Sequence, residues 1–309
     1  MQHVVIGVIT CKRPEWLSRL LDSLLLQQRV LGLKVTVIVV DNASDLTTKE
    51  VVDVRSNINP DIPLVYYIEK QPGIVFARNR CVTEFTALNA DYLMFIDDDE
   101  WLEDEDWIRK MVGAVERFNA DVVTSHVVSV GGEGTPAWAI DLIYGNNTLY
   151  EGQHTDVFYT NNLLLSRHVI EATLPCFDDR FAMTGASDYH FALRCKHLGF
   201  KCVYINSPVK EEFPASRATI KWFCRRGFRS GIGYTRSHLF EEPTLKAVLR
   251  CVAMSLVRAV RGMLSLLKGA VTLNKMTWVE GLFRVSSAAG TIAGFFGVKH
   301  EEYKIIHGK

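Results

Sequence analysis

The segment YLMFIDDD, residues 92–99, decides how the rest of this chain is interpreted. Its first five residues are apolar with no polar alternation, which is typical of a strand buried on both faces of a sheet. Three aspartates follow directly. A buried strand that ends in a row of carboxylates indicates an α/β sheet whose strands carry polar residues at their carboxyl ends, where such sheets bind ligands.

Two earlier segments have the same form. Residues 3–10 (HVVIGVIT) and 34–40 (KVTVIVV) are short, apolar and rich in β-branched residues, as strands are. Apolar residues at helical spacing and turn residues predict the elements between them: helices at residues 14–28, 47–56 and 77–90, and a strand at 64–68. Alternation of strand and helix predicts a mostly parallel sheet, flanked by helices, with right-handed crossovers.

Beyond residue 100 the pattern is more mixed. The expected elements are a helix near residues 101–107, strand-like sequence over 121–165, a helix over 187–197 and a strand over 200–205. We expect an α/β catalytic domain over residues 1–215 and a basic, amphipathic helical region over residues 216–309.

Composition narrows the class of protein. The chain has 309 residues, 48% of them hydrophobic, and 35 basic side chains balance 35 acidic ones. This composition excludes a disordered chain, and the neutral balance argues against nucleic-acid binding through a basic field. Seven cysteines without C-x-x-C spacing predict reduced thiols. Because no signal-peptide pattern and no apolar run of about 18–20 residues occurs, a cytoplasmic location is expected.

The three aspartates at residues 97–99 allow two interpretations. Carboxylate oxygens on a turn suit Mg²⁺ or Mn²⁺, which also takes water and phosphate oxygens as ligands. Alternatively, the acids stabilise the N-terminus of the helix expected near residues 101–107. Polar residues at 10–13 and 41–42 end the neighbouring strands, and their expected convergence on one crevice favours the metal.

Four blocks together resemble the family 2 glycosyltransferases. They are TCKRP (10–14), VVDNAS (39–44), GIVFARN (73–79) and FIDDD (95–99), in the family's order and spacing. The resemblance implies the GT-A fold, a UDP-sugar donor and a divalent metal held by a D-x-D motif, with Asp99 as the metal ligand. It also implies that the nucleotide-sugar is contacted by Thr10 at the base or ribose, Asp41 and Arg78 at the uracil, Asp97 at the nucleoside, and Arg13 and Asp98.

A further segment, TGASDYH at residues 184–190, occupies the place of this family's Gly-Glu-Asp stretch. The resemblance implies that Asp188 is the catalytic base. Ser187 stands where an acid is common, and His190 replaces another family residue. Inverting transfer needs a base for the acceptor hydroxyl and a cation for the departing diphosphate, and Asp188 and Asp99 supply these roles.

Two later segments resemble the succinoglycan-type glucosyltransferases of exopolysaccharide synthesis. They are RATIKWFCRRGFRS (217–230) and GTIAGFFGVKHEEY (290–303), and they imply a lipid-linked oligosaccharide acceptor. Lys221 and Trp222 resemble an element near the acceptor and diphosphate, and Arg225 and Arg226 belong to a basic cluster able to bind a diphosphate. Core packing of Trp222 and a solvated helix face are the plain alternatives.

Residues 244–273 form an amphipathic pattern without acidic residues. Apolar residues occupy one side of a helical wheel, and about one third of the wheel carries Lys246, Arg250, Arg258, Arg261 and Lys268. Such a helix can lie in the plane of an anionic bilayer or pack on the catalytic domain. We expect residues 244–298 to bind the inner face of an anionic membrane, which makes the protein peripheral on the cytoplasmic side.

Two other functions fit parts of the pattern. A sugar-nucleotide pyrophosphorylase shares the sheet and the metal-binding aspartates, but it needs a glycine-rich loop after the first strand, and residues 10–14 contain no glycine. A catalytically inactive nucleotide-binding module is favoured by Ser187 and His190 and opposed by the intact acids at 97–99 and Asp188. The sequence therefore predicts an inverting, metal-dependent glycosyltransferase.

Overall fold

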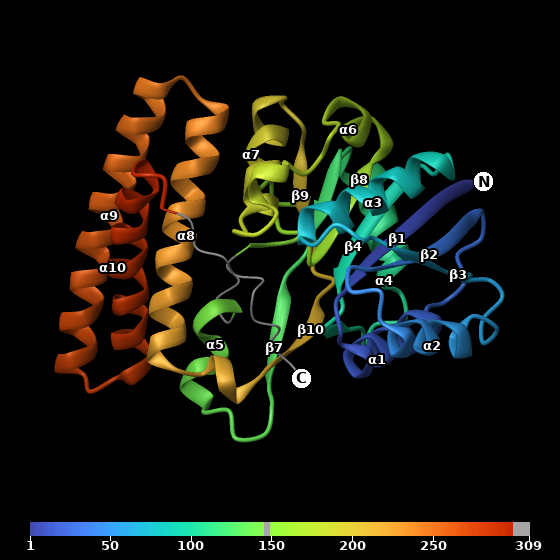
Figure 1. Ribbon diagram of the computed structural model, residues 1–309, viewed down its shortest axis with the longest axis horizontal. Coiled ribbons are helices and arrows are strands. Elements are labelled where there is room, and N and C mark those ends of the chain that lie inside the picture. Colours follow the sequence, from blue (N-terminus) through green and yellow to red (C-terminus); the bar gives the residue numbers. More distant parts are fainter. Residues whose placement is uncertain (145–148, 299–309) are drawn as a thin grey trace.

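A computed structural model describes residues 1–144 and 149–298 of the chain (Figure 1); residues 299–303 of the predicted C-terminal motif lie outside this description. The described central sheet has seven strands in the order β3-β2-β1-β4-β8-β6-β9. Strand β8 runs antiparallel to both of its neighbours, and the other pairs are parallel. The strands are β1 Gln2–Thr10, β2 Leu33–Asp41, β3 Leu64–Ile68, β4 Tyr92–Asp97, β6 Val122–Thr124, β8 Asn162–Ser166 and β9 Cys202–Tyr204.

Helices cover both faces of this sheet, as the alternating sequence predicts. One face packs against α1 Pro14–Leu25, α2 Leu46–Arg55 and α4 Trp107–Phe118, and the other against α3 Ile74–Ala87, α6 Arg167–Ala172 and α7 Ser187–His197. Alternate residues of β1 show the division, because Val4 and Ile6 enter the first core and Val5 enters the second. The mostly parallel, two-faced sheet of the prediction is confirmed.

A second, three-stranded sheet corrects two expectations. Its order is β5-β10-β7, formed by β5 Glu100–Trp101, β10 Val209–Phe213 and β7 Val127–Gly131. The helix expected near residues 101–107 is wrong, because Glu100 and Trp101 are extended and pair with β10, and α4 begins only at Trp107. The strand-like expectation for residues 121–165 missed α5 Ala137–Tyr144, where Ala139 is buried against Phe213 and Phe223.

Three long helices stand beside the sheet region: α8 Ile220–Glu241, α9 Thr244–Val271 and α10 Lys275–Phe295 (Figure 1, orange to red). Two 3-10 turns, Asp179–Phe181 and Ala215–Arg217, lie before them in the chain. Helix α10 packs against both α8 and α9. Glycines allow this approach: a Cβ at Gly269 would lie 2.6 Å from the Trp278 nitrogen, and one at Gly290 would overlap the Phe228 carbonyl.

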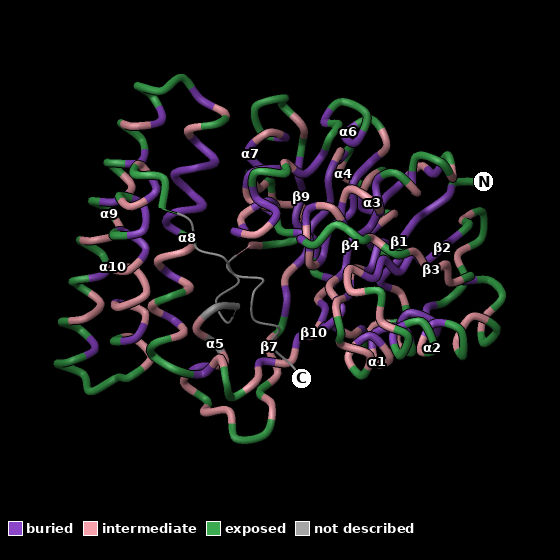
Figure 2. The backbone as a smooth tube through the Cα atoms, in the orientation of Figure 1, coloured by how far each residue is buried: buried purple, intermediate pink, exposed green. Residues whose placement is uncertain are grey.

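The small residues of α9 therefore face the bundle, and most of its large apolar residues do not. Figure 2 shows the contrast between the purple sheet and the largely green and pink α9. The side chains most exposed along its outer face include Leu249, Leu256, Val260, Met263 and Leu267, with Leu256 63% exposed. The cations differ from one another, because Arg258 is half-buried whereas Arg261 is exposed. None of the described helices has the length and hydropathy of a membrane span.

Candidate active site

A cavity of about 820 Å³ lies between the carboxyl ends of the sheet strands and the helical bundle. The sheet side contributes Thr10 after β1, Asn42 after β2 and Asp97 at the end of β4. The helical side contributes Trp222, Arg258 and Phe283. Parallel strands end at one edge of a sheet, so side chains far apart in sequence converge there. The three polar clusters that the sequence placed after β1, β2 and β4 do meet at this edge.

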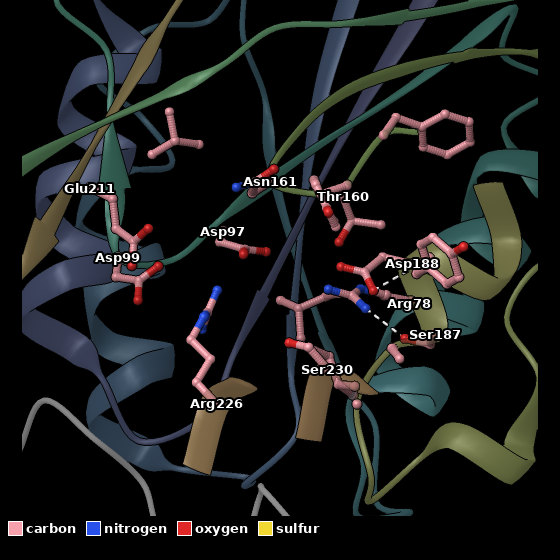
Figure 3. Close-up of a pocket in the computed structure, with 18 of the residues that line it drawn as sticks. Arg78, Asp97, Asp99, Thr160, Asn161, Ser187, Asp188, Glu211, Arg226 and Ser230 are labelled. Carbon is pink, nitrogen blue, oxygen red and sulfur yellow. Dashed lines mark hydrogen bonds between the residues drawn. The ribbon is translucent and has the colours of Figure 1, made fainter. Parts of the chain in front are cut away.

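One wall of the cavity is acidic (Figure 3). The carboxylates of Asp97 and Asp99 follow β4, and Glu211 of β10 points to the same space beside Asp99. Burial raises the pKa of Asp97 to about 7, and burial together with the charge of Asp99 raises the pKa of Glu211 to about 7. Ionised carboxylates placed so close together repel one another. Arg217 offsets part of this repulsion, because it donates a hydrogen bond of 3.1 Å to Glu211 and lies 3.8 Å from the Asp99 carboxylate.

Asp98 faces a different set of partners. It accepts hydrogen bonds from the Thr10 hydroxyl at 2.8 Å and from the Arg13 guanidinium at 2.9 Å. Arg13 also reaches Asp99, with 3.5 Å between nitrogen and oxygen. Burial raises the pKa of Asp98 to about 6, although the charge of Arg13 opposes that rise. Thr10, Arg13 and Asp98 thus form one network along the cavity, and all three line it.

Asp41 lies beneath this edge instead of lining the cavity. It is fully buried, and its carboxylate accepts hydrogen bonds from the backbone nitrogens of Ala43 and Asp45 and from the Tyr66 hydroxyl. These three bonds fix the turn that presents Asn42 to the cavity. A direct contact between Asp41 and a nucleotide stays a prediction.

The acidic wall is suited to a hard divalent cation. In the described part of the chain, no three His, Cys, Asp or Glu side chains are grouped so that they could enclose a metal by themselves. Mg²⁺ and Mn²⁺ accept one or two carboxylates and complete their coordination with water and phosphate oxygens. Asp99, with Asp97 and Glu211 beside it, fits this requirement. Capping of a following helix does not explain the acids, because a strand follows them.

The opposite wall carries Asp188, in the first turn of α7 (Figure 3). Gly185 and Ala186 both have positive φ angles, 73° and 67°, and this turn directs the start of α7 toward the cavity. Ser187 is buried, and its hydroxyl accepts a hydrogen bond of 2.8 Å from Arg78. The serine that replaces an expected acid therefore orients Arg78, which also lines the cavity.

His190 does not belong to this wall. It is 1% exposed, and its Nε2 lies 2.7 Å from the Glu241 carboxylate. Burial lowers the pKa of His190, although Glu241 raises it. The described lining of the cavity includes Asp188 and not His190, so the geometry favours Asp188 as the base.

The four residues predicted to contact the acceptor or the diphosphate lie on two different faces of helix α8. Trp222 and Arg226 line the cavity, and the Arg226 guanidinium lies 5.2 Å from the Trp222 ring centre. Figure 3 shows Arg226 reaching toward Asp97 and Asp99. Lys221 and Arg225, each one position earlier on the helix, are exposed and are not among the lining residues. The structure thus brings one half of this set to the cavity.

Two charged residues of the cavity, Glu211 and Arg258, lie where the sequence motifs do not predict them. Glu211 carried a readable signal: in β10 the residues Val209, Glu211 and Phe213 are buried in alternation, so an acid occupies an inward position of a strand. Arg258 carried no such signal, since the helical wheel groups it with exposed cations. The structure decides its direction through the packing of α9 on α10.

Comparison with known proteins places these features in a family context. A family model described as Glycosyl transferase family 2 matches residues 5–174. Succinoglycan biosynthesis protein ExoM of Rhizobium meliloti (strain 1021) is 28% identical over 235 residues, which cover 74% of this chain and 73% of that protein.

Solved structures resemble the fold over almost the whole chain. Mannosyltransferase PcManGT of Pyrobaculum calidifontis, in complex with GDP-Man and Mn²⁺, has a TM-score of 0.62 and 18% identity, covering 94% of this chain and 87% of that one. S. aureus TarS 1-349, in complex with UDP-GlcNAc, has a TM-score of 0.57 and 13% identity, covering 100% and 95%. These likenesses confirm the predicted GT-A fold.

Proposed function

The chain belongs to glycosyltransferase family 2, and from that premise we propose that it moves a sugar from a UDP-sugar to a hydroxyl of a lipid-linked oligosaccharide, with inversion at the anomeric carbon. The observation that carries this proposal is one cavity with a metal-type acidic wall at Asp97 and Asp99 and a facing base at Asp188. Membership of the family favours this function over a pyrophosphorylase.

The donor site that we propose follows the acidic wall. Thr10, Arg13, Arg78, Asp97 and Asp98 line the cavity where a nucleotide would enter, and Asp41 shapes the turn beside it. A divalent cation, Mg²⁺ or Mn²⁺, would be held at Asp99 and would supply positive charge to the departing diphosphate. The bound GDP-Man and Mn²⁺ of one structural neighbour and the UDP-GlcNAc of another support a nucleotide-sugar donor.

The protein side chains account for the proton and for part of the charge. Asp188 takes the proton from the acceptor hydroxyl as its oxygen forms a bond to the anomeric carbon. The bond between that carbon and the phosphate oxygen breaks on the opposite face, which inverts the configuration. Arg226 reaches toward the acidic wall and can stabilise the negative charge of the leaving nucleoside diphosphate.

The acceptor and the location are inferred from the helical region. The exposed apolar face of α9 is flanked by Lys246, Arg250, Arg261 and Lys268, a combination that binds anionic bilayers in the interfacial plane. Within residues 244–298, α9 presents this face and α10 fills the bundle. We propose a peripheral protein on the cytoplasmic side of the membrane.

The similarity to a succinoglycan biosynthesis protein supports a role in bacterial polysaccharide synthesis. The division into residues 1–215 and 216–309 stays a prediction.

Rates of sugar transfer by point variants test the proposed roles of Asp188 and Asp99. Asp188→Asn should retain metal-dependent UDP binding and lose transfer by about 10²-fold or more, the share of a positioned base. Asp99→Ala should lose both transfer and metal-dependent UDP binding while keeping its fold. His190→Gln is the matched control beside the cavity, and it should retain the ability to transfer. An active Asp188→Asn enzyme would remove the base assignment.

Screening nucleotide-sugars tests the donor class and the inactive alternative. UDP-sugars should raise Tm only with Mn²⁺ or Mg²⁺, and the accepted donor should also be hydrolysed slowly in the presence of metal. Stabilisation without any hydrolysis or transfer would identify an inactive nucleotide-binding module.

Co-sedimentation with anionic liposomes tests the membrane face. Each Lys246→Glu or Arg261→Glu change should weaken binding by about 1 kcal/mol or more, because each cation near an anionic surface contributes about that amount. Arg29→Glu changes an exposed cation that follows α1 in the chain, and α1 lies at the opposite end of the molecule from α9 (Figure 1). This control variant should not weaken binding. Full recovery of wild-type protein in the supernatant at low salt would contradict the membrane proposal.

A further inference from the structure

Arg258 differs from every other basic residue of α9 in where its side chain lies. It turns into the molecule, is half-buried, and donates a hydrogen bond of 2.8 Å to the Thr291 hydroxyl on α10. Its guanidinium carbon lies 4.5 Å from the centre of the Tyr234 ring on α8. Among the described residues that line the cavity, Arg258 is the one contributed by α9.

Within residues 1–144 and 149–298, the charge of Arg258 has no protein counter-ion. No carboxylate in the described ranges forms an ion pair with it, whereas Arg250, two turns earlier on the same helix, pairs with Glu242 at 3.1 Å. Burial lowers the pKa of Arg258, because a partly desolvated cation without an anion is unfavourable. A guanidinium held by one hydroxyl and one aromatic ring keeps most of its five donors free for an anion.

The neighbours of Arg258 place it on the base side of the cavity. Tyr159 lines the same cavity, and its pKa is raised by burial and by the charge of Asp188 and lowered by Arg226 and Arg258. The charges of Asp188, Arg226 and Arg258 therefore all affect the pKa of Tyr159. Tyr189, directly after the base, lies with its ring centre 5.7 Å from that of Tyr234. An anion at Arg258 would thus be bound among aromatic side chains close to Asp188.

We propose that Arg258 binds the diphosphate that joins the acceptor saccharide to its lipid. This assignment rests on the proposed function, because it needs a lipid-linked acceptor. The group that Arg258 would bind is a diphosphate at the end of the acceptor that lies nearest the membrane. This position follows because Arg258 extends inward from α9, the same helix whose apolar face we propose to lie on the membrane. A cavity of about 820 Å³ has the size of a small-molecule site, so the saccharide between the diphosphate and the reacting hydroxyl is short.

Binding of a prenyl diphosphate tests this assignment without knowledge of the saccharide. The probe is geranylgeranyl diphosphate in detergent micelles, added to the full chain with UDP and Mn²⁺ at saturating concentrations so that the donor site is filled. The variants are R258Q, R258K and the control R29Q, where Arg29 is an exposed cation of the sheet region that belongs neither to the cavity lining nor to α9. The measured quantities are the Kd of the probe and, separately, the Kd of UDP.

R258Q should weaken binding of the lipid diphosphate by about tenfold or more, as expected for loss of a hydrogen-bonded charge. R258K should restore part of that loss, and R29Q should bind like the wild type. UDP affinity should be the same in all four proteins, which shows that each is folded. Geranylgeraniol, which lacks the diphosphate, should bind weakly and with no dependence on Arg258.

Several outcomes overturn the assignment. Equal affinity for geranylgeraniol excludes recognition of the diphosphate, and a loss of UDP affinity in both Arg258 variants assigns the residue to the donor site. Inorganic pyrophosphate that binds as tightly as the lipid, and through Arg258, identifies a free anion as the ligand. If the wild-type enzyme transfers sugar to a lipid-linked saccharide but R258Q binds the probe as well as the wild type does, only the role of Arg258 is contradicted. If the wild-type enzyme transfers no sugar to any lipid-linked saccharide, the proposed function itself is contradicted.

Discussion

The sheet region and the three-helix region of this protein pack by opposite rules. In the sheet region, large side chains such as Leu21, Trp107 and Phe85 are fully buried between helices and strands. In the helical region, α9 contacts α10 at Gly262, Gly269 and other small residues, and most leucines of α9, such as Leu249, Leu256 and Leu267, remain outside. Hydrophobicity alone therefore identifies the packed face in the first region and the unpacked face in the second.

The two regions also differ in the charges that they supply to the cavity between them: the described lining carboxylates all come from the sheet region, together with Arg13 and Arg78, whereas the charged lining residues of the three helices are arginines. The sheet region contributes the carboxylates of Asp97, Asp99 and Asp188, and the helical region contributes Arg226 and Arg258. Carboxylates suit a metal and a proton, and guanidinium groups suit phosphate oxygens. The fold thus divides the proposed chemistry: one region handles the metal and the base, and the other handles the phosphates.

The largest expected effect is a difference between two leucines. Leu21→Ala in α1 removes a fully buried side chain from the core and should lower the free energy of unfolding by about 2–5 kcal/mol. Leu256→Ala in α9 removes a side chain that is 63% exposed and should change it by less than about 0.5 kcal/mol. Urea unfolding without lipid measures both. A large loss in Leu256→Ala would mean that the outer face of α9 is packed in solution.

This contrast explains how much of the fold the sequence could predict. The predicted bounds of strands β1, β2 and β4 and of helix α7 agree with the structure to within one residue, because a doubly buried strand and a short helix each depend on local pattern. The helical periodicity of residues 244–273 was correct as well, and α9 spans Thr244–Val271. Which of its faces packs does not follow from hydrophobicity, because the buried residues of α9 are small ones such as Gly262 and Gly269, which fit closely against α10.

The candidate site shows the same division. Asp97, Asp99 and Asp188 lie where the motifs predict, because strand ends and helix starts are local features. Glu211 reaches the acidic wall only through the pairing of β10 with β5 and β7. That small sheet joins segments about a hundred residues apart, and such pairing is decided by tertiary contacts.

A smaller effect, of opposite sign in the two regions, is expected for two glycines in helices. Gly290→Ala in α10 places a Cβ against the backbone of Phe228, so α8 and α10 must separate, at a cost of about 1–3 kcal/mol. Gly113→Ala in α4 meets no atom within 4 Å and should gain about 0.5–1 kcal/mol from lower backbone entropy in the unfolded chain. Thermal unfolding of the two variants measures both changes. If Gly290→Ala were also stabilising, close packing at small residues could not be what holds the helical region together.

The smallest expected effect concerns pH and the acidic wall of the sheet region. Burial is the main cause that raises the pKa values of Asp97 and Glu211 to about 7 each. Both values lie above those of the same side chains in the unfolded chain. Without metal, the folded protein binds more protons than the unfolded chain between about pH 4 and pH 7, so its stability falls as the pH rises through that window.

A divalent cation at Asp99 reverses this preference for the protonated carboxyl groups, because it favours the ionised carboxylates. Mn²⁺ affinity should therefore decrease as the pH falls below about 7, by about tenfold per pH unit for each proton that binding releases. Titration of Mn²⁺ at several pH values, by calorimetry or paramagnetic resonance, measures the slope. Asp97→Asn and Glu211→Gln should each make it shallower, whereas Glu212→Gln, the next residue of β10, should leave it unchanged. A wild-type slope of zero would show that these acids are ionised before the metal binds, and it would separate the acidic wall from metal binding.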